Sequence, residues 1–287
     1  MRVLSPAKIN LLLKVTGKRN DGYHELLTLM VPVNFFDTLY LQKEIEGIEL
    51  DAPDCGCSSV DNLVFKAAGL FKLKTGLKNG VRIRIDKNVP FGAGLGGGSS
   101  NAAHALVALN ELFDTGLKED QLCQMAREIG ADCPFFIHGK SALMGGRGDM
   151  LLSDVLIEER VYLLVIPPFG ISTPKVFSKY KMSLTNNKDV FKIKDITEES
   201  IAPENYLFND LEVSAFELHP ELKTVKMDLI RAGALGALMS GSGSTVFGVF
   251  EDARHLEHAM IKLRKREGYK YIPTTRTLGG VNGDYRS

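Results

Sequence analysis

The chain has 287 residues, of which 44% are apolar, and its 35 Lys and Arg balance 35 Asp and Glu. This is the composition of an ordinary globular protein, long enough for two modest domains or one large one. The zero net charge argues against a general role in binding nucleic acid or a membrane surface, and no apolar run approaches the ~18 residues of a membrane span. We expect a cytoplasmic protein in which Cys55 and Cys57 are free thiols.

The first expected element is a strand over residues 5–15. Its odd-numbered residues from Ile9 to Val15 are apolar and are expected to share one face, so that Lys8 and Asn10 project from the other. Further elements follow in order: a turn at 17–22, strands at 26–33 and 37–42, a loop at 51–62 and a helix at 62–73.

A glycine-rich stretch links the next strand and helix. The strand is predicted over 81–85, and residues 90–103 read Pro-Phe-Gly-Ala-Gly-Leu-Gly-Gly-Gly-Ser-Ser-Asn-Ala-Ala before apolar residues recur at helical spacing. Glycines let backbone N–H groups approach a ligand, and a helix N-terminus adds partial positive charge. Together these features predict a phosphate site.

This stretch can be compared with several known types of phosphate-binding loop. A Walker A loop fails because Gly98 stands where its lysine should be. A dinucleotide fingerprint is matched by Gly92, Gly94 and Gly97, but the acidic residue at the right spacing, Asp114, follows a helix rather than a strand. A glycine-rich turn with no ligand also stays open from the residues alone.

The second half alternates helices and strands. A helix at 119–129, a turn at 145–148 and a buried strand at 161–166 precede an exposed excursion at 180–204. The last third is expected to hold a helix ending near Gly233, strands at 234–239 and 245–250, a helix at 253–266 and a strand at 269–272. That order predicts an α+β layer with helices on one face of an antiparallel sheet, and a domain break near residue 155.

The glycine loop resembles the ATP loop of the GHMP kinases. Two further stretches agree with this resemblance: Ala7-Lys-Ile-Asn-Leu11 continuing to Gly17-Lys-Arg-Asn-Asp-Gly-Tyr-His-Glu25, and Met239-Ser-Gly-Ser-Gly-Ser244. The first of them is similar to the branch that phosphorylates the 2-hydroxyl of a cytidine-diphosphate-linked methylerythritol in the non-mevalonate isoprenoid route. The resemblance implies a two-domain fold, with a ribosomal-protein-S5-domain-2-like ATP domain at 1–155 and a ferredoxin-like domain at 156–287.

The resemblance also implies site residues. Asp132 corresponds to the proposed base, and Lys8 polarises the hydroxyl and keeps the aspartate ionised. ATP is the implied co-substrate and Mg²⁺ is required, with Ser99 or Ser100 as a candidate ligand. The implied ATP contacts are Pro90, Gly92, Gly94, Leu95, Gly96, Gly97, Gly98, Ser99, Ser100, Asn62 and Lys87, and the implied substrate contacts are Asn10, Tyr23, His24, Thr173 and Phe177. A bulkier residue at Gly96 is expected to raise the KM for ATP.

Alternatives remain at this point. Lys8 could be a solvated strand lysine, and Asp132 could be a helix N-cap before Pro134. The chain could be another GHMP kinase, of homoserine or mevalonate type, or a non-catalytic nucleotide-binding protein on the same fold. We expect a monomer or weak homodimer that acts on a small molecule.

Overall fold

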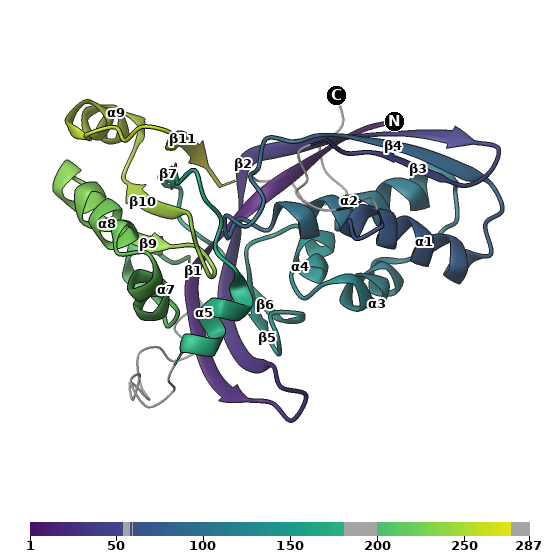
Figure 1. Cartoon of the computed structure of the whole chain (residues 1–287), viewed down its shortest axis with the longest axis horizontal. Helices are drawn as coiled ribbons and strands as arrows, with labels where there is room; N and C mark the ends of the chain where they lie inside the picture. Colours follow the sequence, from purple (N-terminus) through teal and green to yellow (C-terminus); the bar gives the residue numbers. More distant parts are fainter. Residues whose placement is uncertain (54–57, 59, 181–199, 277–287) are drawn as a thin grey trace.

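The computed structural model describes residues 1–53, 58, 60–180 and 200–276. Two sheets pack against each other, and most of the helices lie on the side of each sheet that faces away from the other (Figure 1). Cys55, Cys57 and most of the expected excursion at 180–204 lie outside the described residues.

The larger sheet has seven strands in the order β3-β4-β2-β1-β8, with β5 pairing to β2 and β6 pairing to β5. Its strands are β1 Arg2–Lys18, β2 His24–Glu44, β3 Ile48–Asp51, β4 Gly80–Asp86, β5 Ala142–Gly145, β6 Met150–Asp154 and β8 Phe208–Asn209. Its helices are α1 Leu63–Thr75, α2 Gly97–Leu112, α3 Glu119–Ile129 and α4 Cys133–His138. The predicted alternation on β4 is confirmed, because Ile83 and Ile85 are buried in the core beneath these helices.

The prediction for β1 is wrong in its second half. Ile9 and Leu11 pack in the core between the two sheets, as expected, but so does Leu12, while Leu13 lines a cleft together with Asn10. The cause is an irregularity in the pairing with β2 between Asn10 and Leu12. A bulge adds one residue to a strand and reverses the alternation of faces beyond it. The two strands expected at 26–33 and 37–42 form the single strand β2.

The smaller sheet is antiparallel throughout, in the order β11-β7-β10-β9. Its elements are β7 Val161–Ile166, α5 Thr173–Lys179, the 3-10 helix η2 Pro203–Tyr206, α7 Glu212–Leu218, α8 Glu221–Ala232, β9 Gly236–Met239, β10 Val246–Phe250, α9 Ala253–Lys262 and β11 Lys270–Thr275. The last helix ends at Lys262, four residues before its predicted end. The predicted α+β arrangement is confirmed, with α8 and α9 on one face of the sheet (Figure 1).

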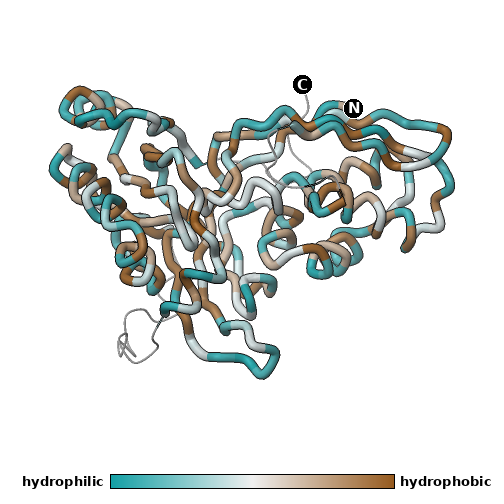
Figure 2. The backbone as a smooth tube through the Cα atoms, viewed as in Figure 1, coloured by the Kyte–Doolittle hydropathy of each residue, from teal (hydrophilic) through white to brown (hydrophobic). Residues whose placement is uncertain are grey.

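Apolar residues on β7 explain how the two sheets stack. Tyr162 and Leu164 face the larger sheet, whereas Leu163 and Val165 pack under the C-terminal helices. A strand buried on both faces reads as a continuous apolar run. Figure 2 shows the same arrangement as apolar strands in the interior and polar turns at the edges.

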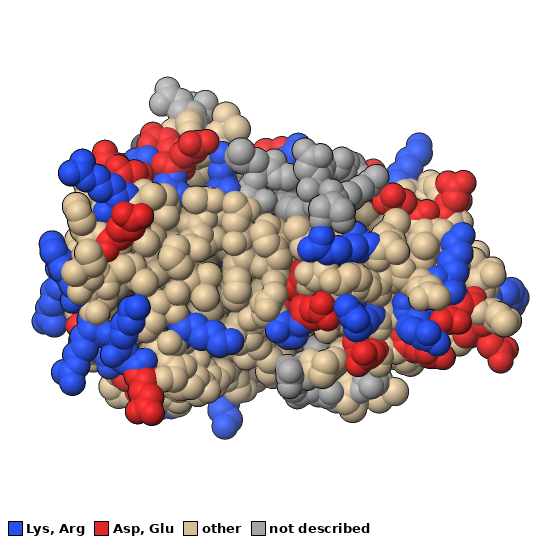
Figure 3. Space-filling view, turned by 90° about the horizontal axis from the view of Figure 1, so that it is seen from above, with Lys and Arg blue, Asp and Glu red and all other residues tan. Residues whose placement is uncertain are grey.

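Charged side chains of both signs are interspersed on the face shown in Figure 3, around a broad area of uncharged residues. In the part of the chain that is described, no helix combines the length and the apolar character needed to cross a bilayer. We propose a domain division near residue 155, between β6 and β7. Strand β8 crosses it, because Leu12 and Leu13 of β1 pair with β8.

His104 generates a prediction about stability. It is completely buried on α2, and burial lowers its pKa from 6.5 to about 4. The unfolded chain therefore binds a proton as the pH falls through 6.5, while the folded protein does so only near pH 4. We expect this histidine to remove roughly 3 kcal/mol from the free energy of unfolding between pH 7 and pH 4. Urea titrations of His104→Asn should show a shallower pH dependence than wild type, whereas the exposed His258→Asn should match wild type.

Candidate active site

A cleft of about 1100 Å³ lies where the two sheets meet. All but one of the predicted site residues line this single cleft, although they come from widely separated parts of the chain. They are Lys8, Asn10, Tyr23, His24, Asn62, Lys87, Pro90, Gly92, Gly94, Leu95, Gly96, Gly97, Gly98, Ser99, Asp132, Thr173 and Phe177. The exception is Ser100, which is fully buried and accepts a hydrogen bond from Ser5 at 2.7 Å. Of the two candidate metal ligands, Ser99 is therefore the one that faces the cleft.

Backbone hydrogen bonds hold the glycine loop from three sides. Lys8 N donates to the Leu95 carbonyl at 2.9 Å, Ile171 N to Gly92 at 3.1 Å and Thr245 N to Ala93 at 3.1 Å. Each bond uses a carbonyl of the loop. The loop is thus fixed to β1, to the segment before α5 and to the β9–β10 connection. Its own N–H groups take no part in these three hydrogen bonds.

The N-terminus of α2 opens into the cleft. Its N-cap is Gly96, and no side chain caps the first turn. The first N–H groups of a helix have no partner within the helix and carry partial positive charge. This sixteen-residue helix therefore presents unpaired N–H groups to the cleft, which is the arrangement expected of an anion site.

Two glycines of the loop are required by packing rather than by a ligand. A Cβ on Gly94, whose φ is +75°, would lie 2.2 Å from the Ser240 carbonyl oxygen. A Cβ on Gly96 would lie 3.0 Å from the Phe136 ring and 3.1 Å from Cε of Lys8. A bulkier residue at Gly96 would therefore press on Lys8, so its effect on the KM for ATP would not isolate the phosphate contact.

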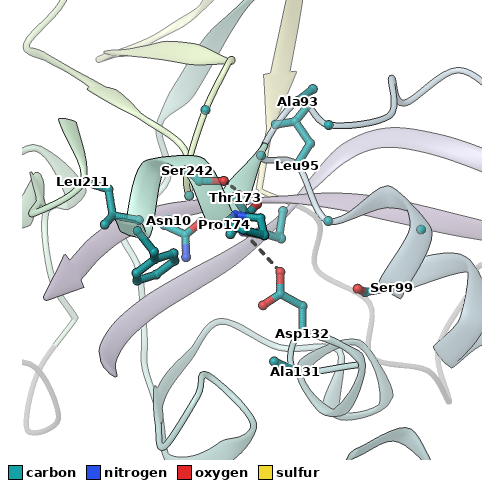
Figure 4. A pocket seen from close by; sticks show the side chains of 18 of the residues that line it. Asn10, Ala93, Leu95, Ser99, Ala131, Asp132, Thr173, Pro174, Leu211 and Ser242 are labelled. Atoms are coloured by element: carbon teal, nitrogen blue, oxygen red, sulfur yellow. Dashed lines mark hydrogen bonds and ion pairs between the residues drawn. The ribbon is translucent and has the colours of Figure 1, made fainter. Parts of the chain in front are cut away.

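Lys8 and Asp132 form an ion pair across the cleft, with 3.4 Å between Nζ and Oδ2. The sequence-based expectation of salt-bridge distance is confirmed. The Lys8 ammonium also donates to Oδ1 of Asn10 at 2.6 Å, and the Asn10 amide donates to Thr28 at 2.8 Å. Figure 4 shows Asp132 pointing at the strand that carries Asn10, with the ion pair drawn as a dashed line.

Asp132 stands at the N-cap position of α4, yet its side chain makes no capping hydrogen bond. About 29% of the side chain is exposed. Asp132 therefore occupies an N-cap position, as one alternative from the sequence expected, but its carboxylate does not cap the helix. The carboxylate is left to face Lys8 and the open cleft.

Aromatic side chains gather at the end of the cleft formed by the β1–β2 turn and α5. The rings of His24 and Phe177 stack with centroids 4.9 Å apart. Tyr23 is largely exposed, and the Arg147 guanidinium lies 5.3 Å from its ring centre. Thr173 shares a hydrogen bond of 2.8 Å with Ser242 (Figure 4).

The surroundings of His24 favour its neutral form. Partial burial, and secondarily the charge of Lys18, lowers its pKa below 6.5. A neutral imidazole has one donor and one acceptor nitrogen. It can therefore donate one hydrogen bond and accept another, in different directions.

Two predicted nucleotide contacts also serve the protein itself. Asn62 is the N-cap of α1, where its side chain accepts from Val64 N at 2.9 Å. Lys87 lies 2.7 Å from the buried Asp37 and also donates to the Val89 carbonyl.

The sequence analysis missed a polar run, Asn209-Asp210-Leu211-Glu212. The Asn209 amide donates to the carbonyls of Met239 and Gly241, both at 2.8 Å, and a Glu212 oxygen accepts from Met239 N at 2.9 Å. These bonds fix the Ser240–Ser244 connection against the cleft. The polar residues where a strand meets a helix are visible in the sequence. Their hydrogen-bond partners are not, because these lie about 30 residues away and no local pattern identifies them.

Comparison with known proteins agrees with this geometry. Residues 62–140 match the family model described as GHMP kinases N terminal domain, and residues 193–268 match GHMP kinases C terminal. A homoserine kinase from Cytophaga hutchinsonii has a similar fold, with a TM-score of 0.76 at 17% identity over 96% of this chain and 94% of that one. The fold and the site define a GHMP kinase, an enzyme that uses ATP.

Relatives of higher sequence identity indicate the branch of this superfamily. The chain is 40% identical to a 4-diphosphocytidyl-2-C-methyl-D-erythritol kinase of Syntrophus aciditrophicus, over 92% of this chain and 95% of the relative. The corresponding enzyme of Protochlamydia amoebophila is 44% identical over 86% of this chain and 83% of its own length. A crystal structure of a kinase of this name has a TM-score of 0.79 at 34% identity, covering 96% of this chain and all of that one. The chain belongs to the family of 4-diphosphocytidyl-2-C-methyl-D-erythritol kinases.

Gly98 gives the clean test of the phosphate site. A Cβ there would meet only Leu63, at 3.9 Å, and would project at the exposed start of α2. We expect Gly98→Ala to fold normally, because alanine favours a helix, and to weaken ADP binding about tenfold by blocking close approach to the N–H groups. Isothermal titration with ADP measures this. Gly69→Ala, also in a helix with open space around it, should bind ADP as wild type does, and equal affinity of the two variants would contradict the assignment.

Proposed function

We propose that this chain transfers the γ-phosphoryl group of ATP to the 2-hydroxyl of 4-diphosphocytidyl-2-C-methyl-D-erythritol, giving the 2-phosphate and ADP. A bond forms between the substrate oxygen and the γ-phosphorus, and the bond from that phosphorus to the β,γ-bridging oxygen breaks. The hydroxyl proton passes to the Asp132 carboxylate. One observation carries the proposal: the Lys8–Asp132 pair, 3.4 Å apart, lies in the same cleft as the glycine loop and the aromatic side chains.

The placement of Lys8 supports its role. Its backbone N–H is bonded to Leu95 of the glycine loop, and its Cε lies next to Gly96. An ammonium so close to the start of α2 can stabilise charge on the transferring phosphoryl group and on the attacking oxygen. Asn10 orients the ammonium through its 2.6 Å bond.

Magnesium fits this site as an ion carried by the triphosphate. Among the described residues no cluster of three or more His, Cys, Asp or Glu could hold a metal. Mg²⁺ commonly binds through one or two protein oxygens together with substrate phosphates. Ser99 is the protein oxygen donor that we propose for it, and the ion would neutralise phosphate charge.

The aromatic end of the cleft supports recognition of cytosine. Stacking on Tyr23 or Phe177 suits a flat pyrimidine, and the imidazole of His24 can form a hydrogen bond with its edge. The amide of Asn10 and the hydroxyl of Thr173 line the cleft and are suited to hydroxyls of the erythritol and its neighbourhood. We further propose a cytoplasmic monomer or weak homodimer acting on a small molecule, with no nucleic acid or membrane partner, in keeping with a net charge of zero.

Asp132→Asn tests the chemistry. The amide keeps the shape and loses the basicity, so we expect kcat to fall roughly 100-fold or more while substrate binding survives. ADP release with ATP and the cytidine-linked alcohol measures turnover, and homoserine and mevalonate serve as comparison acceptors. Near-normal turnover in the variant would reduce Asp132 to a positioning group, because a loose phosphoryl transition state needs little base.

Tyr23→Ala tests the two ends of the cleft separately. We expect the KM for the cytidine substrate to rise about tenfold, as for the loss of one stacked ring, while the KM for ATP stays within twofold. Tyr40→Ala is the matched control, because Tyr40 does not line this cleft. A rise in the KM for ATP instead would mean that the two pockets are assigned the wrong way round.

A further inference from the structure

Asp37 is a buried carboxylate that the proposed chemistry does not use. It lies on β2, and none of its side chain is exposed. A charged group in the interior is costly unless hydrogen bonds and an opposite charge replace its water. The hydrogen-bond partners of Asp37 should therefore indicate its role.

Four donors converge on this carboxylate. Oδ2 accepts from the Lys87 ammonium at 2.7 Å and from the Asn101 amide at 2.9 Å. Oδ1 accepts from the backbone N–H groups of Asn88 at 2.7 Å and Val89 at 2.8 Å. Both oxygens thus have two partners each, which explains how the charge is tolerated.

The four donors lie on the two sides of the glycine loop. Residues 87–89 directly precede the loop, and Asn101 is in the second turn of α2, directly after it. One carboxylate on β2 therefore holds both ends of the segment 90–100. The loop between them cannot lengthen, or shift relative to α2, without breaking a charge-assisted hydrogen bond.

The same contact directs Lys87. Its ammonium lies 3.1 Å from the position that a Cβ on Gly97 would take, and the residue lines the cleft. An ammonium has three donors. Asp37 and the Val89 carbonyl are the two acceptors described for it, so one donor is left for an oxygen at the start of α2.

We propose that Asp37 is a positioning residue for ATP, acting through Lys87: it fixes the span of the phosphate loop and directs the Lys87 ammonium to the nucleotide. This inference rests on the proposed placement of ATP at the glycine loop. It adds a residue from a different strand, without contact to the nucleotide, to the determinants of ATP affinity.

Asp37→Asn is the direct test. In this variant an amide N–H would face the donors of Lys87 and Asn101, so the ammonium must move. We expect ADP affinity to fall about tenfold or more in isothermal titration, with a matching rise in the KM for ATP, while the KM for the cytidine substrate stays within twofold. Asp86→Asn is the control, since Asp86 is half exposed and pairs with Arg84 at the end of β4; it should behave as wild type.

A merely structural role would lower the melting temperature and leave both KM values unchanged, and this outcome would overturn the proposal. Lys87→Gln retains a donor for Asp37 and removes the charge, so it remains testable if Asp37→Asn does not fold. Unchanged ADP affinity in Lys87→Gln would also overturn the proposal. In the double variant the two losses should not multiply, because both act on one ammonium; multiplied losses would contradict action through Lys87.

The Gly98→Ala variant separates this inference from the proposed function. If Gly98→Ala leaves ADP affinity unchanged, the placement of ATP is wrong. If Gly98→Ala weakens ADP binding and folded Asp37→Asn does not, the placement stands and the role of Asp37 is wrong.

Discussion

The buried ammonium of Lys8 is the interaction on which the rest of the site depends. Only 5% of this side chain is exposed, so its charge must be balanced by groups that the fold supplies. Asn10 comes from the same strand, Asp132 from the start of α4, and Gly241 packs beside Nζ from the β9–β10 connection. Removing one partner of such a pair leaves an uncompensated charge. The Lys8–Asp132 pair therefore also ties β1 of the larger sheet to the start of α4.

The glycine loop shows why glycine-rich motifs are ambiguous in sequence. Gly94 and Gly96 are needed because backbone or side chains of the protein occupy the space of a Cβ. Gly98 has open space, and its lack of a side chain has no structural explanation within the described residues. The phosphate that we propose at the helix N-terminus would account for that position. In the sequence, a glycine required by packing looks the same as a glycine that leaves room for a ligand. Only the packing around each position distinguishes the two.

Periodic features were predictable from the sequence and long-range polar contacts were not. The helices at 63–75 and 119–129 and strand β4 follow from local spacing, and the family motifs identified the residues of the cleft. The reversal of faces after Asn10 was not predictable, because a bulge depends on the partner strand. The hydrogen bonds of Asp37 were also hidden, since its partners lie at least 50 residues away along the chain.

The two ends of the cleft are built differently, and this difference fits the two ligands of a kinase. At the end with the glycine loop, backbone hydrogen bonds and a buried carboxylate fix the loop, as suits the proposed triphosphate, whose γ-phosphorus must be held in line. At the other end Tyr23 is 58% exposed, and the Arg147 guanidinium lies 5.3 Å from its ring centre. A cation–π contact is weak compared with the bonds of the loop. The aromatic end can therefore adjust to the proposed base, while the glycine loop and Lys8 would set the distance between phosphate and hydroxyl.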